Sequence, residues 1–405
     1  MGAGIPAIQK ANITVRKRLF ASMTLISDIL RLLSLLRQRR TATAPSSRIS
    51  SAVDAVVADL PLPILTFTGT SFECGRRYAQ WVMGERPEHI HRLLHSAWAS
   101  PCESEIKTLF KEHARPALLF SEGIASVIGG HKTIPTRYSG INSDQAASPG
   151  ADTECTSFSV SPRHTLCGQT ISGQTKDTDV TSLSEYILLR LRPIDAPPIA
   201  VLTYPGELLG YGLWGTGMSL FRNSIHCAGS SPEGLDFHQF GLLSLSQTRT
   251  SDIRALGRKL QIKGKGNLLI TDVRGDAISI EFNGAGKNIL EPGNGILTHA
   301  NHCEGSVTAT LSKYSDPVEE KNSLFRSSYL REQIEAGSPT LTPQRIYSIL
   351  SDHVRYPRGI CRHQIGQSVF KRTTATVIAE NSTLTLNVSL GNPCMSWPTS
   401  IRLLD

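Results

Sequence analysis

The distribution of apolar and polar residues divides the chain into a helical first part and a strand-rich second part. Residues 72–99 and 103–127 carry apolar residues at the spacing of amphipathic helices, with an interruption near Pro87. A short apolar run at 64–67 precedes them and predicts a strand. From Cys155 onward, runs that alternate with period two predict strands, with helices between them. The pattern therefore predicts an α+β protein in which layered sheets are covered by helices.

Two hairpins are predicted in the second part. Each one places two alternating runs on either side of a polar turn: 267–271 with 277–282, and 374–379 with 383–390. Further strands are predicted at 156–160, 165–175, 186–191 and 199–204. Helices are predicted at 242–262, 323–336 and 343–353, the last with Thr342 as its N-cap and Pro343 as its first helical residue.

Positive charge is concentrated at the start of the chain. The 405 residues carry a formal net charge of +8, and residues 1–60 hold nine basic and three acidic side chains, which account for +6 of it. The nearly neutral remainder offers no basic surface for nucleic acid, so we expect no nucleic-acid partner. No apolar run is long enough to predict a stable membrane span. Residues 1–61 are predicted to be a basic leader and linker, either disordered or a targeting segment such as a mitochondrial transit peptide.

The eight cysteines are far apart and form no CxxC pair, which indicates free thiols in a reducing compartment. We therefore expect an intracellular protein, either cytoplasmic or organellar. Zinc was considered for His302, Cys303, Cys361 and His363, but their spacing fits no standard site. The sequence thus predicts neither a metal nor a cofactor.

Cys155 is the first candidate for chemistry, because it stands at the predicted start of a strand, directly after a Gly/Ser/Pro-rich connection. A cysteine at a chain N-terminus can use its own α-amino group, with a pKa of about 8, as the general base. That chemistry requires cleavage of the Glu154–Cys155 bond. A buried, inert thiol is the alternative, and this local pattern by itself favours the alternative.

Three later residues could complete such a site. Asp177 follows the next predicted strand, and antiparallel pairing of the two strands would bring it back beside Cys155. Asn301 and Arg362 follow in polar segments further along the chain. Each has a simpler interpretation, as a turn residue, a loop cap and a surface charge respectively, and only their combination and order favour a catalytic site.

Six short segments, taken together and in this order, resemble one known family. They lie at 69–75 (Gly-Thr-Ser-Phe-Glu-x-Gly), 155–157 (Cys-Thr-Ser), 173–177 (Gly-Gln-x-x-Asp), 281–282 (Glu-Phe), 298–303 (Thr-His-x-Asn-His-Cys) and 360–362 (Ile-Cys-Arg). The family is the acyl-coenzyme A:6-aminopenicillanic acid acyltransferase family of N-terminal nucleophile hydrolases, and the resemblance runs from about residue 64 to residue 390.

The resemblance implies a four-layer αββα sandwich. Residues 62–154 would form a helical pro-region that stays bound as a small subunit, and residues 155–405 would form the catalytic chain. The uncut chain would be a zymogen, activated by autocatalytic cleavage between Glu154 and Cys155. The two processed chains would remain associated with each other.

The resemblance also implies a role for each site residue. Cys155 would be the nucleophile and Asn301 would donate its side-chain amide to an oxyanion hole. Asp177 would orient the nucleophile and its amine, and Arg362 would pair with Asp177 or help to hold the site.

The reaction implied is amide-bond chemistry on a small-molecule amide or an acyl-coenzyme A. An acyl-enzyme on Cys155 would pass its acyl group to water or to an amine, and hydrolysis is favoured because water needs no acceptor pocket. The alternative is a non-catalytic, unprocessed relative that acts as a binding or scaffold protein. Glu154 supports that alternative, because the family usually has a small residue before the nucleophile.

Overall fold

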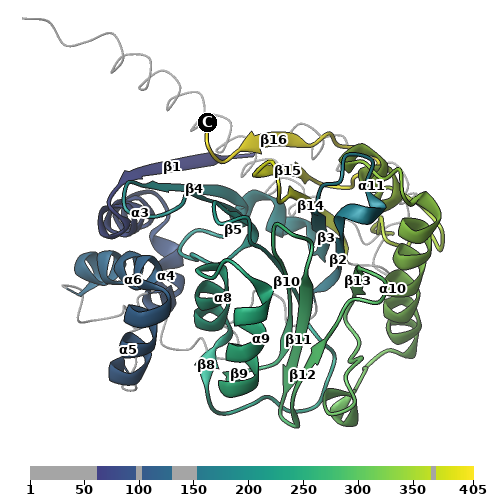
Figure 1. Ribbon diagram of the computed structural model, residues 1–405, viewed down its shortest axis with the longest axis horizontal. Helices are drawn as coiled ribbons and strands as arrows, with labels where there is room; N and C mark the ends of the chain where they lie inside the picture. Colours follow the sequence, from purple (N-terminus) through teal and green to yellow (C-terminus); the bar gives the residue numbers. More distant parts are fainter. Residues whose placement is uncertain (1–61, 97–102, 130–152, 366–370) are drawn as a thin grey trace, which may run out of the picture. The chain divides into compact units, whose positions relative to one another are not determined.

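The computed structural model describes residues 62–96, 103–129, 153–365 and 371–405. The predicted leader at 1–61 and most of the connection before Cys155 lie outside these ranges. Within them, two large sheets are covered by helices on their outer faces (Figure 1). No helix in these ranges combines the length and the apolar character that crossing a membrane requires.

The first sheet has eight strands in the described part of the chain. All neighbouring strands are antiparallel except for the edge strand β1, which pairs in parallel with β4. In order across the sheet, the strands are β1 (Ile64–Gly69), β4 (Ile187–Pro193), β5 (Ile199–Thr203), β6 (Tyr211–Trp214), β7 (Ser219–Asn223), β10 (Gly266–Thr271), β11 (Ala277–Asn283) and β12 (Gly286–Leu290).

The second sheet has six antiparallel strands in the same described ranges. Its order is β13 (Ile296–His299), β2 (Glu154–Val160), β3 (Ile171–Thr178), β14 (Arg372–Glu380), β15 (Thr385–Leu390) and β16 (Thr399–Arg402). Every residue of β2 and β3 is buried, because helices cover one face of this sheet and the first sheet covers the other. Central strands of this kind hold their side chains rigidly, which suits a catalytic site.

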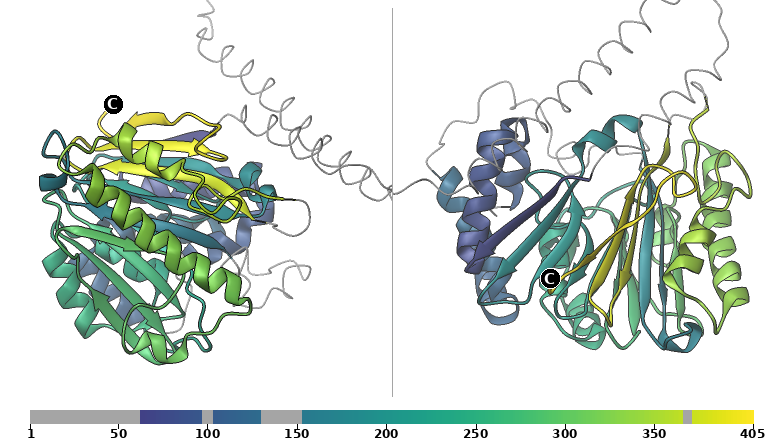
Figure 2. Two further views of the ribbon diagram at one scale, coloured as in Figure 1. Left: turned by 90° about the vertical axis from the view of Figure 1, so that its right-hand side faces the viewer. Right: turned by 90° about the horizontal axis from the view of Figure 1, so that it is seen from above.

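Helices complete the outer layers, and the right-hand view of Figure 2 shows the layers side by side. On the first sheet lie α3 (Ser71–Glu85), α4 (Ile90–Ser96), α5 (Glu103–His113), α6 (Arg115–Ile128), α8 (Phe237–Leu245) and α9 (Thr250–Lys259). On the second sheet lie α10 (Pro317–Gly337) and α11 (Pro343–Leu350). Short 3₁₀ helices occupy Pro87–His89, Pro162–His164, Val180–Glu185 and Thr308–Leu311, and β8 (Leu235–Asp236) pairs with β9 (Ile262–Lys263).

Three separate apolar cores hold the layers together. One fills the space between the first sheet and its helices, and includes Phe120 and Phe240. The second lies between the sheets and includes Phe221 of β7 and Val377 of β14. The third packs Leu330 of α10 against the second sheet. Three cores require four layers, so the predicted αββα sandwich is confirmed.

The part of the chain before Cys155 contributes a strand to the first sheet as well as helices that pack on it. β1 is an edge strand of the first sheet, so residues 62–154 and the later residues share one sheet. Thr70 and Glu73 form a reciprocal capping box at the start of α3. Gly75 lets α3 approach α6 closely, because a Cβ at this position would collide with the backbone carbonyl of Phe120. The segment 69–75 is therefore explained by helix capping and packing.

Most predicted elements are present, with shifted ends. Thr342 caps α11 with Pro343 at its first position, and both hairpins pair as expected. The prediction of a strand from 165 was wrong: β3 begins at Ile171, because Thr165 Oγ1 bonds to both the N–H and the carbonyl of Gln169 and closes a turn. The helix at 242–262 is two helices, α8 and α9. The strand predicted at 156–160 begins two residues earlier, at Glu154, and so includes Cys155.

Candidate active site

Cys155 lies at the second position of β2, and its side chain is 1% exposed. β2 pairs with β3 as predicted, but the register differs by one residue from the expectation that Asp177 would lie beside Cys155. Cys155 is opposite Lys176, and Glu154 is opposite Asp177. Since successive side chains point to opposite faces of a sheet, Cys155 and Lys176 share one face while Glu154 and Asp177 share the other.

On the face of Cys155, the neighbouring cation is Lys176. Its ammonium group hydrogen-bonds to Tyr211 and lies 5.5 Å from the ring centre of Tyr204, so this buried charge is stabilised by aromatic groups. Burial raises the pKa of the Cys155 thiol, and the charge of Lys176 opposes that rise. Lys176 is thus the group on this face that favours a thiolate.

A pocket of about 60 Å³ opens beside Cys155 between the two sheets. Its charged side chains are three cations and one carboxylate, and four aromatic side chains also line it. Glu207, the carboxylate, pairs with Arg222 at 3.1 Å. The lining therefore carries an excess of positive charge. The residues concerned are Lys176, Tyr204, Glu207, Tyr211, Arg222, Phe237, Lys265 and Phe282.

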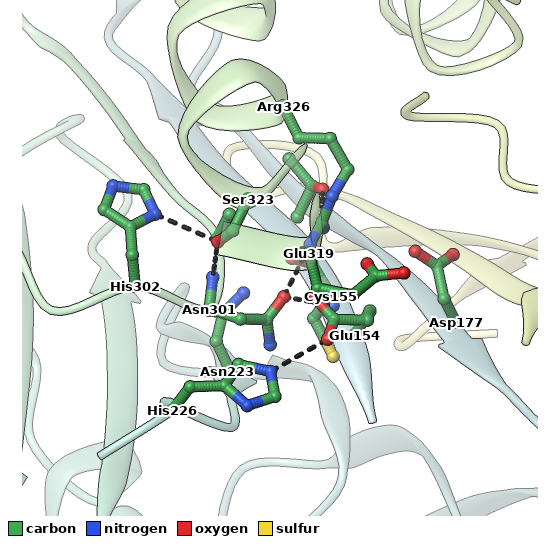
Figure 3. Close-up of polar contacts among 12 residues, drawn as sticks. Glu154, Cys155, Asp177, Asn223, His226, Asn301, His302, Glu319, Ser323 and Arg326 are labelled. Carbon is green, nitrogen blue, oxygen red and sulfur yellow. Dashed lines mark hydrogen bonds and ion pairs between the residues drawn. The ribbon is translucent and has the colours of Figure 1, made fainter. Parts of the chain in front are cut away.

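On the opposite face, Arg326 of α10 binds the peptide segment around the expected cleavage point (Figure 3). Its guanidinium, which is 0% exposed, donates to the Cys155 carbonyl at 2.6 Å and to Glu154 Oε2 at 2.6 Å. Glu154 is also fully buried, and His226 Nε2 lies 2.8 Å from its Oε1. Burial alone would raise the pKa of Glu154, but His226 and Arg326 outweigh it and lower this pKa. The bulky residue before Cys155 therefore has a complementary, charged site of its own.

Asn301 lies beside Cys155 at the point where the chain leaves β13. Its Oδ1 accepts from the Cys155 N–H at 2.8 Å and from Arg326 at 2.8 Å. Its Nδ2 donates to the Ser224 carbonyl at 2.8 Å and to the Thr153 carbonyl at 3.3 Å. In the uncut chain, this amide therefore holds both sides of the Glu154–Cys155 peptide segment in place.

The turn that carries Asn301 is fixed by a buried ion pair between the family-like residues Glu281 and His299, whose Nε2 lies 2.6 Å from Glu281 Oε1. The carboxylate also accepts from the N–H groups of Glu304 and Gly305. Although burial would raise the pKa of Glu281, these contacts, led by His299, lower it to about 2. Glu281 therefore acts on the site indirectly, by holding the turn after β13.

Asp177 and Arg362 lie near each other without the direct pairing that the resemblance implied. Arg362 binds Glu319 with two hydrogen bonds, of 2.9 and 2.6 Å. Asp177 Oδ1 accepts from Thr373 at 2.7 Å, and its Oδ2 makes no hydrogen bond within the described ranges. The electrostatic contact with Asp177 still favours the charged form of Arg362. Arg362 thus faces Asp177 while being held by Glu319.

Asp177 is expected to make stability depend on pH. Burial raises the pKa of its carboxyl group to about 6, although Arg326 and Arg362 oppose this. An acid with a raised pKa in the folded state costs stability as pH rises through the interval between its unfolded and folded pKa values. In an uncut Cys155→Ala background, Asp177→Asn should therefore raise the free energy of unfolding at pH 8 by up to about 3 kcal/mol. At pH 4 the same change should have little effect.

Urea unfolding of both proteins at the two pH values measures this difference. Asp179→Asn, a change at an N-cap residue on the same polar segment, is the control, because Asp179 is exposed. Equal effects of Asp177→Asn at pH 4 and pH 8 would contradict the assignment of the titration to Asp177.

Sequence reasoning missed several residues of this site. They are Lys176, His226, Glu319 and Arg326. A weak signal existed for Arg326, because helical spacing places it on the same face of α10 as Ser323 and Leu330, and this face is buried. A charged residue on the core-facing side of a helix indicates a buried partner.

The four residues considered for zinc do not form one group. His302 Nδ1 bonds with Ser323 at 3.0 Å, and Cys303 has Cys227 as its neighbour. Cys361 Sγ and His363 Nε2 lie 3.4 Å apart in a different place, the segment between α11 and β14. All cysteines in the described ranges are free thiols, as predicted for those residues.

Comparisons with known proteins add to this picture. Residues 167–394 match the family model described as acyl-coenzyme A:6-aminopenicillanic acid acyl-transferase, a range that begins after Cys155 and contains Asp177, Asn301 and Arg362. No curated protein matches the chain.

Solved structures with a similar arrangement have low identity to this chain. A mutant of conjugated bile acid hydrolase from Clostridium perfringens has 10% identity and a TM-score of 0.41, covering 61% of this chain and 92% of that chain. A second variant of the same hydrolase has 11% identity and a TM-score of 0.44, with coverages of 62% and 93%. Penicillin V acylase from Agrobacterium tumefaciens has 11% identity and a TM-score of 0.36, with coverages of 59% and 75%.

Proposed function

Because the chain belongs to the acyl-coenzyme A:6-aminopenicillanic acid acyl-transferase family, we propose that it is a self-processing amidohydrolase or acyltransferase whose nucleophile is Cys155. The observation that carries this proposal is the position of Cys155. Its backbone is held on both sides, by Asn301 at the N–H and by Arg326 at the carbonyl, while its side chain lines the pocket. This arrangement presents a thiol beside a fixed peptide bond.

Processing would begin with attack of the Cys155 sulfur on the Glu154 carbonyl carbon. The C–N bond breaks, the nitrogen takes up the thiol proton and becomes the α-amine of Cys155, and a thioester remains. Water then hydrolyses the thioester, which leaves a carboxylate on Glu154 and a free thiol on Cys155. The ion pairs of Glu154 with Arg326 and His226 support this step, because they fix the carbonyl that is attacked.

The processed site would then act on external amides. The α-amine of Cys155 serves as the base, since its ordinary pKa of about 8 lies near physiological pH. Release of Thr153 would free Asn301 Nδ2 to donate to the oxyanion of the substrate. Asp177 and Arg362 are positioning residues in this scheme, on the side of the strand that faces α10.

The pocket favours a small substrate that carries an anionic group and an apolar part. Lys176, Arg222 and Lys265 supply the positive charge, and four aromatic side chains supply the apolar wall. Thr153 also lines this pocket, so processing would enlarge it. Hydrolysis is favoured over acyl transfer, because water needs no second binding site.

Intact-mass measurement with N-terminal sequencing of the purified chain tests the proposal. We expect a fragment that begins Cys-Thr-Ser-Phe, together with turnover of amides that is faster for anionic than for neutral members of a matched series. Turnover is measured by release of a chromogenic amine. A single uncut chain without turnover would contradict the proposal.

The uncut result would support the second candidate, an unprocessed binding protein. The observation that favours this candidate is the burial of Glu154, whose ion pairs with Arg326, His226 and Lys371 stabilise the uncut chain. The presence or absence of the Cys155 N-terminus separates the two candidates directly.

A further inference from the structure

Four side chains with metal-binding atoms converge near the C-terminal end of the chain, at a cluster that the proposed catalysis does not use. They are His353, Cys361, His363 and Cys394, and their ligand atoms all lie within 4.8 Å of one another. They come from two places: His353, Cys361 and His363 lie in the irregular segment between α11 and β14, and Cys394 lies in the turn after β15 (Figure 1). Four such side chains in one place suggest a single ligand that all of them bind.

Four of the six separations between these ligand atoms are close to those of a tetrahedral site. The two sulfurs are 3.5 Å apart, His363 Nε2 lies 3.4 Å from Cys361 Sγ and 3.5 Å from Cys394 Sγ, and the two Nε2 atoms are 3.1 Å apart. A tetrahedral zinc ion with ordinary bond lengths separates two sulfurs by about 3.8 Å, a sulfur and a nitrogen by about 3.6 Å, and two nitrogens by about 3.4 Å. All four measured separations lie within a few tenths of an ångström of these values.

We propose that His353, Cys361, His363 and Cys394 form a structural zinc site. Two thiolates and two imidazoles in a tetrahedral arrangement favour Zn²⁺ over calcium or magnesium, which prefer oxygen ligands. All four positions are filled by protein atoms, so no position remains open for substrate. The burial of the ligands is graded: Cys361 is buried, Cys394 and His363 are intermediate, and His353 is exposed. His353 thus offers an entry path for the ion.

The surroundings of the cluster suit a metal that organises the chain. Residues 351–365, the described part of the chain that follows α11, contain turns but no helix or strand. Asn392 Nδ2 donates to the Arg362 carbonyl at 2.7 Å and lies 3.5 Å from Cys361 Sγ, as a group that orients a thiolate ligand would. Zinc would therefore fasten this irregular segment to the turn after β15.

The zinc site would also support the positioning residues Arg362 and Asp177. In the sequence, Arg362 stands between the proposed ligands Cys361 and His363. Its backbone N–H donates to Thr373 Oγ1 at 2.9 Å. Thr373 in turn donates to Asp177 at 2.7 Å. Loss of the ion would free the segment that holds this chain of contacts, so we expect slower processing as a secondary effect.

Metal analysis of the full-length chain, purified without a polyhistidine tag and without chelators, tests the proposal. We expect about one zinc ion per chain. Cys361→Ser and Cys394→Ser should each reduce the zinc content to background, and His353→Ala should weaken its retention during dialysis. Cys167→Ser is the matched control, because Cys167 is exposed and lies far from the four proposed ligands in the sequence. This variant should keep the zinc.

A second test labels the cysteines with an alkylating reagent and locates the label by peptide mass spectrometry. It uses the wild-type chain, so it also applies if the variants do not fold. In the wild-type chain, a chelator should expose Cys361 and Cys394 to iodoacetamide, and added Zn²⁺ should protect both again. Cys167 should react equally throughout. Absence of zinc, zinc that survives both serine substitutions, or a Cys361–Cys394 disulfide in the purified chain would each overturn the proposal.

Discussion

Replacement of Cys155 by alanine is expected to leave the whole chain uncut and to abolish amide turnover. The substitution removes only the sulfur, because the N–H still donates to Asn301 and the carbonyl still accepts from Arg326. The strand and its register should therefore be unchanged. Without the sulfur no acyl intermediate can form, so both the cleavage and the turnover should fall to the background rate. Intact mass and the amide assay measure the two effects separately.

Two further variants make the test specific. Cys155→Ser keeps a nucleophilic oxygen in the same place, so we expect slow cleavage at the same bond. Cys167→Ala, an exposed cysteine, should be cut at the wild-type rate. Normal cutting of Cys155→Ala after residue 154 would exclude self-processing and assign the cleavage to another protease.

The pairing of the strand of Cys155 with the strand of Asp177 could be predicted from the sequence, but the face of each side chain could not. Period-two alternation identifies a strand, while the register depends on where its partner begins. The turn at Thr165 moved the start of β3 to Ile171. A difference of one residue then placed Lys176, instead of Asp177, opposite Cys155. Local patterns carry no information about such long-range alignment.

The two arginines of the site show a second limit of sequence reasoning. Arg362 lies in a motif that resembles the family, and it does lie near Asp177, but its hydrogen bonds go to Glu319, which no motif marked. Arg326 lies outside every motif and yet contacts Glu154, Cys155 and Asn301. Such contacts depend on how α10 packs over β2, which only the folded structure defines.

The zinc cluster illustrates the same point. Cys361 and His363 are two residues apart, so their proximity was visible in the sequence. Their partners His353 and Cys394 are brought in by the turn after α11 and by the end of β15. The sequence offered His302 and Cys303 instead, because they are neighbours in the chain, and the structure places them with Ser323 and Cys227.

Arg326→Met is expected to be the most destabilising single change at the site. The substitution keeps the length of the side chain while removing the positive charge that binds Glu154 Oε2 at 2.6 Å. Glu154 would then remain fully buried, with its contacts to His226 and Lys371 left. Removal of one partner of a buried ion pair costs about 3–5 kcal/mol, because the other charge is left without compensation. Urea unfolding in the uncut Cys155→Ala background measures the loss at pH 7.

The pH dependence of the stability loss in Arg326→Met tests whether the unpaired Glu154 carboxylate causes it. Its partners lower its pKa in the folded state, so the stability that it contributes is present above its unfolded pKa and is lost as pH falls through its folded pKa. The difference between the parent and Arg326→Met should therefore shrink in acid. Adding Glu154→Gln should restore part of the stability at pH 7, since a neutral amide costs less to bury than an unpaired carboxylate.

The comparison with Lys321→Met separates the buried charge from a general effect of changing α10. Lys321 lies on the same helix and is exposed, so its loss should alter the free energy of unfolding by no more than about 0.5 kcal/mol. In the self-processing chain, Arg326→Met should also slow the cut, because the carbonyl of Cys155 and the carboxylate of Glu154 lose their shared donor. If Arg326→Met and Lys321→Met proved equally stable, or if Glu154→Gln gave no recovery, the ion pair would not be what holds the Glu154–Cys155 bond in place.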